Sequence, residues 1–114
     1  MISEELLPVV PYSEVRKKIG NGKPLVIAFG MSHCYSCQAM SRVFAGIKKS
    51  HPDHQIYSVD GQKERIVLRD EFGLKEMPVQ LFFNAEGDEV FRHTGAYKRV
   101  VAEIILKKYG FGQG

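Results

Sequence analysis

The fold is decided by residues 25–37, which read Leu25-Val26-Ile27-Ala28-Phe29-Gly30-Met31-Ser32-His33-Cys34-Tyr35-Ser36-Cys37. The first six residues carry no charge, as is typical of a strand buried on both faces of a parallel sheet. After Cys34, apolar side chains recur at the three- and four-residue spacing of a helix with one buried face. These side chains are Cys37, Met40, Val43, Phe44 and Ile47. The pattern predicts a buried strand that leads directly into a helix, which the two cysteines open and which ends near residues 50–52.

The spacing of the two cysteines indicates thiol chemistry rather than a structural crosslink. A Cys34–Cys37 disulfide would close a very short loop, and the stabilisation from a disulfide grows with loop length. A thiol attacks a disulfide only as the thiolate. At a helix start the macrodipole stabilises an anion by about 0.3–1 kcal/mol, and each free backbone N–H can add a bond of roughly 1.5–3 kcal/mol. We therefore expect Cys34 to be a nucleophile with a lowered pKa, and Cys37 to be a less exposed, resolving thiol with a higher pKa.

The rest of the chain alternates predicted strands and helices. Leu7 to Val10 is short, apolar and bounded by prolines, which suits an edge strand, and Ser13 can cap a helix that runs to Ile19. Further strands are expected at residues 55–60, 79–84 and 89–94, further helices at 64–72 and 98–108, and a hairpin turn at 85–88. The last helix is expected to bury Val101, Ile104 and Ile105. The resulting order, β-α-β-α-β-α-β-β-α, predicts an α/β fold in a single domain over residues 1–114.

Composition and charge exclude several classes of protein. With 114 residues, 44% hydrophobic and 25% charged, the chain has the size and balance of one ordinary globular domain. Its net charge of +3 comes from 16 basic and 13 acidic residues that are interleaved, so we expect neither a nucleic-acid nor a membrane partner. The acidic start, Met1 to Pro8, lacks the basic and apolar regions of a signal peptide. We expect a cytoplasmic protein, with a periplasmic location as the alternative if a signal peptide or anchor has been removed.

Four segments of the chain share their order and approximate spacing with a known family: residues 26–37, Met77-Pro78-Val79, residues 84–87 and Gly95-Ala96. Thioredoxins carry similar segments in this order. Over nearly the whole chain the sequence resembles the thioredoxin-like superfamily. The resemblance implies a thioredoxin fold, in which a central mixed β-sheet is flanked by helices. It also implies a protein-disulfide oxidoreductase whose redox-active center is the Cys34–Cys37 pair, acting in electron transport and cell redox homeostasis.

The same resemblance assigns partners and further site residues. It implies a monomer without a cofactor or metal, which exchanges with protein substrates carrying disulfides or thiols and with an upstream thiol reductase or oxidase. Pro78 would be a cis-proline that faces the cysteines, and Met77 would offer its backbone to a substrate strand. His33, Tyr35 and Gly95 would also contact the substrate.

The chain departs from the thioredoxins proper at these site positions. Where they carry Trp-Cys-Gly-Pro-Cys, this chain has His33-Cys34-Tyr35-Ser36-Cys37, so it resembles a thioredoxin-related protein rather than a housekeeping thioredoxin. The family's buried acid, six positions before the first cysteine, is Ala28, so resolution is expected to be slower or to use water. The family's helix-kinking proline is replaced by Arg42, and an aromatic residue of its rim is replaced by Gly30.

Three alternatives remain open from the sequence. Soft ligands for Cu(I) could gather near the cysteines, which makes a copper-handling, metallochaperone-like protein the main alternative. These ligands would be Met31, His33, Cys34, Cys37, Met40 and Met77. The spacing of the cysteines from His51 and His54 comes near that of a zinc finger, although the strand-to-helix context is wrong for one. In the third alternative, a scaffold domain carries the cysteines incidentally. Whether an oxidoreductase would act as reductase, oxidase or isomerase depends on the reduction potential of the pair.

Overall fold

The computed structural model describes residues 5–112, so residues 1–4, which begin the acidic N-terminal segment, and residues 113–114 lie outside the described residues. The helices and strands of the described part follow one another as α1 (Tyr12–Arg16), β1 (Leu25–Gly30), α2 (Tyr35–Ser50), β2 (Gln55–Asp60), α3 (Arg65–Phe72), β3 (Val79–Phe83), β4 (Glu89–Thr94) and α4 (Arg99–Lys108). From β1 onward, these bounds agree closely with the predicted ones.

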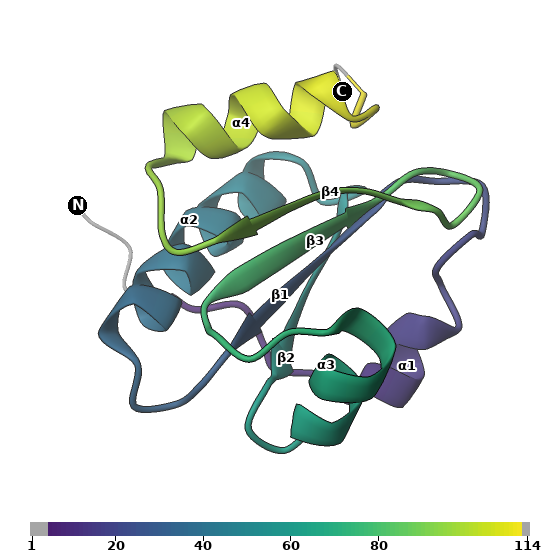
Figure 1. The fold of residues 1–114 in the computed structure, drawn as a ribbon. Coiled ribbons are helices and arrows are strands. Elements are labelled where there is room, and N and C mark those ends of the chain that lie inside the picture. Colours follow the sequence, from purple (N-terminus) through teal and green to yellow (C-terminus); the bar gives the residue numbers. More distant parts are fainter. Residues whose placement is uncertain (1–4, 113–114) are drawn as a thin grey trace.

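β1 lies inside a four-stranded mixed sheet with the strand order β2-β1-β3-β4. It pairs in parallel with β2 and antiparallel with β3, and β3 pairs antiparallel with β4. Its first five residues are buried, because strands flank it on both sides and helices cover both faces of the sheet (Figure 1). The predicted buried strand, the mixed sheet and the α/β class are confirmed.

The sheet separates two apolar cores. Figure 1 shows α2 and α4 on one face of the sheet and α1 and α3 on the other. Val26 from β1 packs in the same core as Phe44 from α2, whereas the next residue, Ile27, packs with Leu68 from α3. Successive side chains of a strand point to opposite faces. The even-numbered residues of β1 therefore lie on the α2 face, and this is the face that carries the cysteines.

The chain before β1 differs from the prediction. Leu7 to Val10 contributes only an isolated parallel bridge between Val9 and Ser58, since the neighbouring prolines cannot donate to a ladder. α1 is not capped by Ser13 and ends before Ile19. Instead, the backbone N–H of Tyr12 donates to Glu64 Oε2 at 2.8 Å. A carboxylate from a distant part of the chain thus accepts a free backbone N–H of the first turn, the role that was expected of the Ser13 side chain.

The buried face of α4 also differs from the prediction. Ile104 is 63% exposed and Val101 39%, whereas Ala102 and Leu106 are buried, and Ile105 is partly buried against the same core. Apolar residues occupy most positions from 100 to 106, so two overlapping stripes fit the helical period. The stripe that contains Ala102 is the buried one, because its small side chain lets α4 approach the sheet and α2 closely.

Candidate active site

The site begins where β1 ends and α2 starts. Cys34 occupies the N-cap of α2 with an extended backbone, and its sulfur accepts the backbone N–H of Cys37 at 3.2 Å. Its carbonyl accepts the N–H of Gln38 at 3.0 Å, which is the first bond of the helix. The sulfur therefore takes the place that a serine or aspartate oxygen usually takes at a helix start. The prediction that the cysteines open a helix is confirmed.

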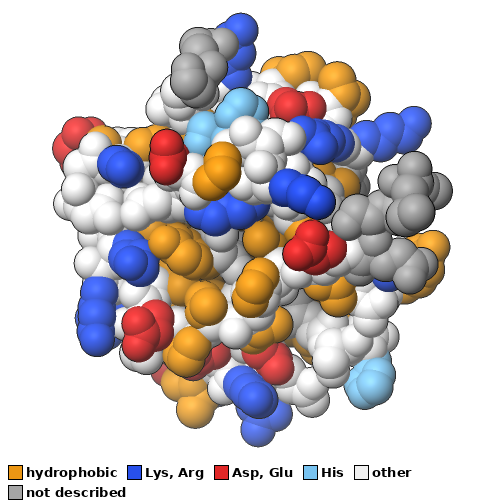
Figure 2. Space-filling model, turned by 180° about the vertical axis from the view of Figure 1, so that it is seen from behind, with side chains coloured by type: hydrophobic (Ala, Val, Ile, Leu, Met, Phe, Trp, Pro, Cys, Tyr) orange, Lys and Arg blue, Asp and Glu red, His pale blue; other side chains and the backbone are white. Residues whose placement is uncertain are grey.

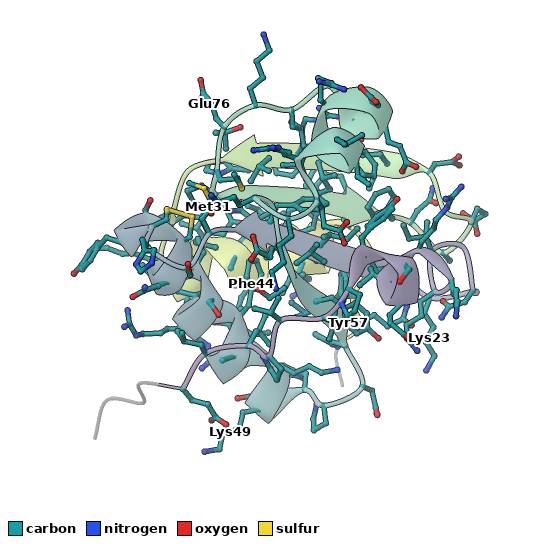
Figure 3. All side chains as sticks on the ribbon, turned by 90° about the horizontal axis from the view of Figure 1, so that it is seen from below. Lys23, Met31, Phe44, Lys49, Tyr57 and Glu76 are labelled. Atoms are coloured by element: carbon teal, nitrogen blue, oxygen red, sulfur yellow. A yellow bond between two sulfur atoms is a disulfide. The ribbon has the colours of Figure 1, made fainter. Side chains whose placement is uncertain are left out.

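Cys34 and Cys37 form a disulfide, with their Cα atoms 5.1 Å apart. Figure 3 shows it as a yellow bond at the start of α2, close to Met31. Cys37 is 7% exposed and lies on the buried face of the helix, whereas Cys34 is half-buried. The Ser36 hydroxyl lies 3.5 Å from the Cys34 sulfur. The pair thus has an outer sulfur surrounded by donors and an inner sulfur that faces the core.

The residues around Cys34 form an exposed rim. Tyr35 is 86% exposed, and His33 is exposed on the other side of Cys34. The side chain of Gln38 donates to the carbonyl of Ser32 at 2.7 Å, which ties the loop before the cysteines to the first turn of α2. The structure thus places His33 and Tyr35 at the surface beside the outer sulfur, and their contact with a substrate stays a prediction.

The segment before β3 lies next to the end of β1. Phe29 pairs with Val79 in the antiparallel register, so Pro78 falls beside Gly30, the residue that leads to the cysteines. The Met77–Pro78 peptide bond is cis. The Pro78 carbonyl accepts the backbone N–H of Gly95 at 2.8 Å. This bond links Gly95 to the segment before β3, and the contact of Gly95 with a substrate stays a prediction.

A buried polar network behind this segment was not predicted. The Gln80 side chain, which is fully buried, donates to the Gly95 carbonyl at 3.1 Å and lies 3.3 Å from His93 Nδ1. The His93 ring lies edge-on to the Tyr97 ring, with their centroids 4.6 Å apart. Burial raises the pKa of the Tyr97 hydroxyl, which has no hydrogen-bond partner among the described residues. The sequence signal was a single glutamine within the apolar run of β3.

The structure gives the copper alternative little support and contradicts the zinc alternative. Met40 is 1% exposed, and its sulfur accepts the backbone N–H of Tyr97 at 3.2 Å, so it is engaged in the core. The zinc-finger interpretation is wrong, because His51 and His54 follow the far end of α2, roughly 20 Å from the cysteines at 1.5 Å per residue. Within residues 5–112, no group of three or more His, Cys, Asp or Glu side chains could hold a metal ion.

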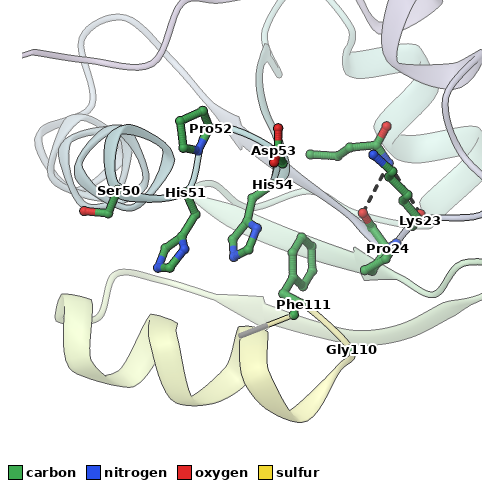
Figure 4. A pocket seen from close by; sticks show the side chains of 11 residues that line it. Lys23, Pro24, Ser50, His51, Pro52, Asp53, His54, Gly110 and Phe111 are labelled. Atoms are coloured by element: carbon green, nitrogen blue, oxygen red, sulfur yellow. Dashed lines mark hydrogen bonds between the residues drawn. The ribbon is translucent and has the colours of Figure 1, made fainter. Parts of the chain in front are cut away.

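The two histidines instead build a cavity of about 330 Å³ at the opposite end of the molecule (Figure 4). The rings of His51 and His54 are stacked, with their centroids 4.6 Å apart. The Phe111 ring lies edge-on to His54, with a centroid distance of 5.2 Å. Lys48 donates to the carbonyls of Pro52 and His54. Burial, followed by the nearby His51 and Lys48, lowers the pKa of His54. These contacts close the turn between α2 and β2.

The surface shows no dominant charge on the face in Figure 2, where basic, acidic and apolar side chains alternate. Of the helices in the described part of the chain, none has the length and apolar character needed to span a lipid bilayer.

Comparisons with known proteins relate this site to a known fold. Residues 12–110 match the family model for a thioredoxin-like domain. A thioredoxin from Nicotiana alata is 24% identical, with a TM-score of 0.77 over 95% of this chain and 97% of that one. A mutant thioredoxin from Halobacterium salinarum is 18% identical, with a TM-score of 0.78 over 94% and 92%. Fasciola hepatica thioredoxin is 19% identical, with a TM-score of 0.76 over 89% and 96%. A search of the curated proteins gave no match.

Proposed function

This chain belongs to the thioredoxin-like domain family, and from that premise we propose that its Cys34–Cys37 pair exchanges with the cysteines of other proteins. The fold together with a Cys-x-x-Cys disulfide supports a thiol-disulfide oxidoreductase in general terms. The observation that carries the specific roles is the asymmetry of the two sulfurs. Cys34 caps α2 and is half-buried, while Cys37 is buried one turn further along. Cys34 is therefore the nucleophile, and Cys37 is the resolving thiol.

The reaction has two exchange steps. In the reduced protein, the Cys34 thiolate attacks a substrate disulfide, one substrate sulfur leaves as a thiolate, and a mixed disulfide forms. Cys37 then loses its proton and attacks the Cys34 sulfur, which releases the second substrate sulfur as a thiolate. Both released thiolates take up protons, so the substrate gains two electrons and the Cys34–Cys37 disulfide forms. The same steps in reverse oxidise a dithiol.

Local donors support the thiolate at Cys34. The Cys37 backbone N–H already points at the Cys34 sulfur, and the Ser36 hydroxyl is within reach. Hydrogen bonds to a charged group each contribute roughly 1.5–3 kcal/mol, and the helix N-terminus adds a smaller favourable term. These interactions stabilise the anion more than the neutral thiol, so they favour ionisation near neutral pH.

The proposed substrate surface surrounds the outer sulfur. His33 and Tyr35 are exposed there, and the backbone of Met77 beside Pro78 is proposed to pair with an extended substrate segment. A mode of this kind gives affinity through main-chain hydrogen bonds, with little dependence on the substrate sequence. We propose protein disulfides or dithiols as substrates, and an upstream thiol reductase or oxidase that restores the starting state.

Limiting iodoacetamide tests the proposed function on the reduced protein. Near neutral pH, we expect alkylation of Cys34 before Cys37, and loss of insulin disulfide reduction in proportion to modified Cys34, because the thiolate is the reactive form. Mass spectrometry locates the modification, and the unfolded protein serves as the control in which both thiols react alike. Alkylation of Cys37 first would contradict the roles. Tight Cu(I) binding without disulfide reduction would favour the metallochaperone alternative instead.

A further inference from the structure

The second exchange step requires an acceptor for the proton of Cys37. A thiol must become a thiolate before it attacks, and burial in apolar surroundings disfavours the charged form. Cys37 is 7% exposed and packs on the α2 face of the sheet. On β1, the two residues of that face nearest to it are Ala28 and Gly30, and neither can accept a proton. The acceptor must therefore come from another strand or from solvent.

The neighbouring strand supplies a carboxylate on the same face. Ala28 pairs with Ser58 and Gly30 pairs with Asp60 in the parallel register of β1 and β2. Val26 and its partner Ile56 both lie in the core under α2. Side chains two positions apart on a strand share a face, so Ser58 and Asp60 also lie on the α2 side of β2.

A cavity of about 230 Å³ is lined by both Asp60 and Cys37. Its described lining includes Leu7, Gly30, Cys37, Ser41, Ser58 and Asp60. A Cβ atom on Gly30 would stand 3.0 Å from Cys37 Cβ and 3.5 Å from Cys37 Sγ, so the absence of a side chain at Gly30 lets Cys37 pack closely against the end of β1, beside Asp60. The volume is sufficient for several water molecules, and the serine and carboxylate groups can bind them.

Asp60 is held in place while keeping one oxygen available. Its Oδ1 accepts the backbone N–H groups of Gln62 at 2.9 Å and Lys63 at 3.2 Å. Its Oδ2 accepts no hydrogen bond from the part of the chain that the structure describes. Among the described residues that line the cavity, Cys37 and Asp60 are the two with ionisable side chains.

The other charged residues nearby are not among the described residues that line this cavity. The side chains of Glu5 and Lys63 are exposed, and Glu64 accepts the backbone N–H of Tyr12, a residue of the core on the opposite face of the sheet. No other carboxylate of this region therefore lines the cavity beside Cys37.

We propose that Asp60 is the proton acceptor for Cys37 when the mixed disulfide is resolved, with water in the cavity as the link. The proton of the Cys37 thiol passes to the Asp60 carboxylate. The Cys37–Cys34 sulfur bond forms, the bond from Cys34 to the partner breaks, and the electron pair leaves on the partner's sulfur. Asp60 then returns its proton to solvent through the open cavity. This inference rests on the proposed function, because it concerns the second exchange step.

The test is the Asp60→Asn variant, in which Oδ1 still accepts the two backbone N–H groups. The reduced protein is mixed with dithiobis(nitrobenzoate) in a stopped-flow instrument. Attack by Cys34 releases one coloured thiolate, and resolution by Cys37 releases a second. We expect the first phase to be unchanged and the second to slow by roughly ten- to hundredfold near pH 7, at or below the usual range for general-base catalysis because water remains as an alternative acceptor. The difference in the rate of this second phase between the variant and the unmodified protein should decrease as the pH rises, because hydroxide can then accept the Cys37 proton.

Two further variants sharpen the result. Asp88→Asn removes the same charge in the exposed β3–β4 turn and should leave both phases unchanged. Ala28→Asp, added to Asp60→Asn, puts a carboxylate on β1 below the inner sulfur and should restore the second phase at some cost in stability, because a buried carboxyl is disfavoured by desolvation. In the otherwise unchanged protein, Ala28→Asp should speed resolution near neutral pH.

The possible outcomes separate this inference from the proposed function. If the unmodified protein releases neither thiolate, both are wrong. If it resolves normally and folded Asp60→Asn resolves at the same rate with the same pH profile, only the Asp60 role is wrong. Should Asp60→Asn fail to fold, the Asp60 carboxyl carbon is followed by NMR in the reduced protein and in Cys37→Ser. A titration that changes when the Cys37 thiol is removed supports the coupling, and identical titrations overturn it.

Discussion

Replacing Cys34 by serine is expected to abolish the reduction of protein disulfides, with a loss of about 10³-fold or more, the scale seen when an enzyme loses its nucleophile. A serine hydroxyl is not ionised near neutral pH and does not exchange with disulfides. Serine is also a favoured N-cap residue, so its oxygen can accept the backbone N–H that the Cys34 sulfur now accepts. The fold should therefore survive, and the loss should report the chemistry alone.

Cys37→Ser is the matched control for this result. It keeps the Cys34 thiolate but removes the group that resolves the mixed disulfide, so covalent adducts with substrate proteins should accumulate. Non-reducing electrophoresis and mass spectrometry identify the adducts and the cysteine that carries them. Adducts on Cys37 in the Cys34→Ser variant, with none in Cys37→Ser, would reverse the two roles.

Phe44→Ala is expected to lower the free energy of unfolding by about 3–5 kcal/mol, the usual cost of truncating a buried phenylalanine. Phe44 is fully buried at the centre of α2, on the face that also carries Cys37 and Met40. It packs with β1 and α4 in one core. Its removal should loosen the packing of α2 against the sheet, and because α2 also carries Cys37, resolution should also slow.

The control for this variant is Ile104→Ala on α4. Ile104 is 63% exposed, so its truncation should change the free energy of unfolding by no more than about 0.5 kcal/mol. Urea denaturation of the two variants measures both values. Similar losses in the two variants would mean that Ile104 belongs to the core, and that the buried face of α4 described above is wrong.

Much of the fold could be predicted because its decisive signals are local. The charge-free run of β1 and the helical spacing from Cys37 to Ile47 lie within one continuous stretch, and each indicates its element independently of the rest. The start of α1 could not be predicted in the same way. Its first N–H is satisfied by Glu64, and no pattern near Ser13 encodes a contact with so distant a residue. On α4, the choice between two apolar stripes depended on packing against α2.

The site residues also differ in whether local sequence or contacts between distant segments place them. Cys34 as a helix cap and Cys37 as the inner thiol followed from their separation of three residues, which fixes their positions on a helix. Asp60 did not stand out, because its place next to Gly30 depends on the register between β1 and β2. The role of Gln80 likewise depends on Gly95, which lies on a different segment.

A redox titration of the Cys34–Cys37 couple tests the central claim most directly. The protein is equilibrated in dithiothreitol or glutathione buffers of stated potential, and the fraction of free thiol is measured after acid quenching and alkylation. The account predicts one reversible two-electron transition at a potential between about −270 and −120 mV, the range of catalytic dithiols. A couple that stays oxidised to potentials below about −300 mV, as structural disulfides do, would contradict the claim that this disulfide exists to be exchanged.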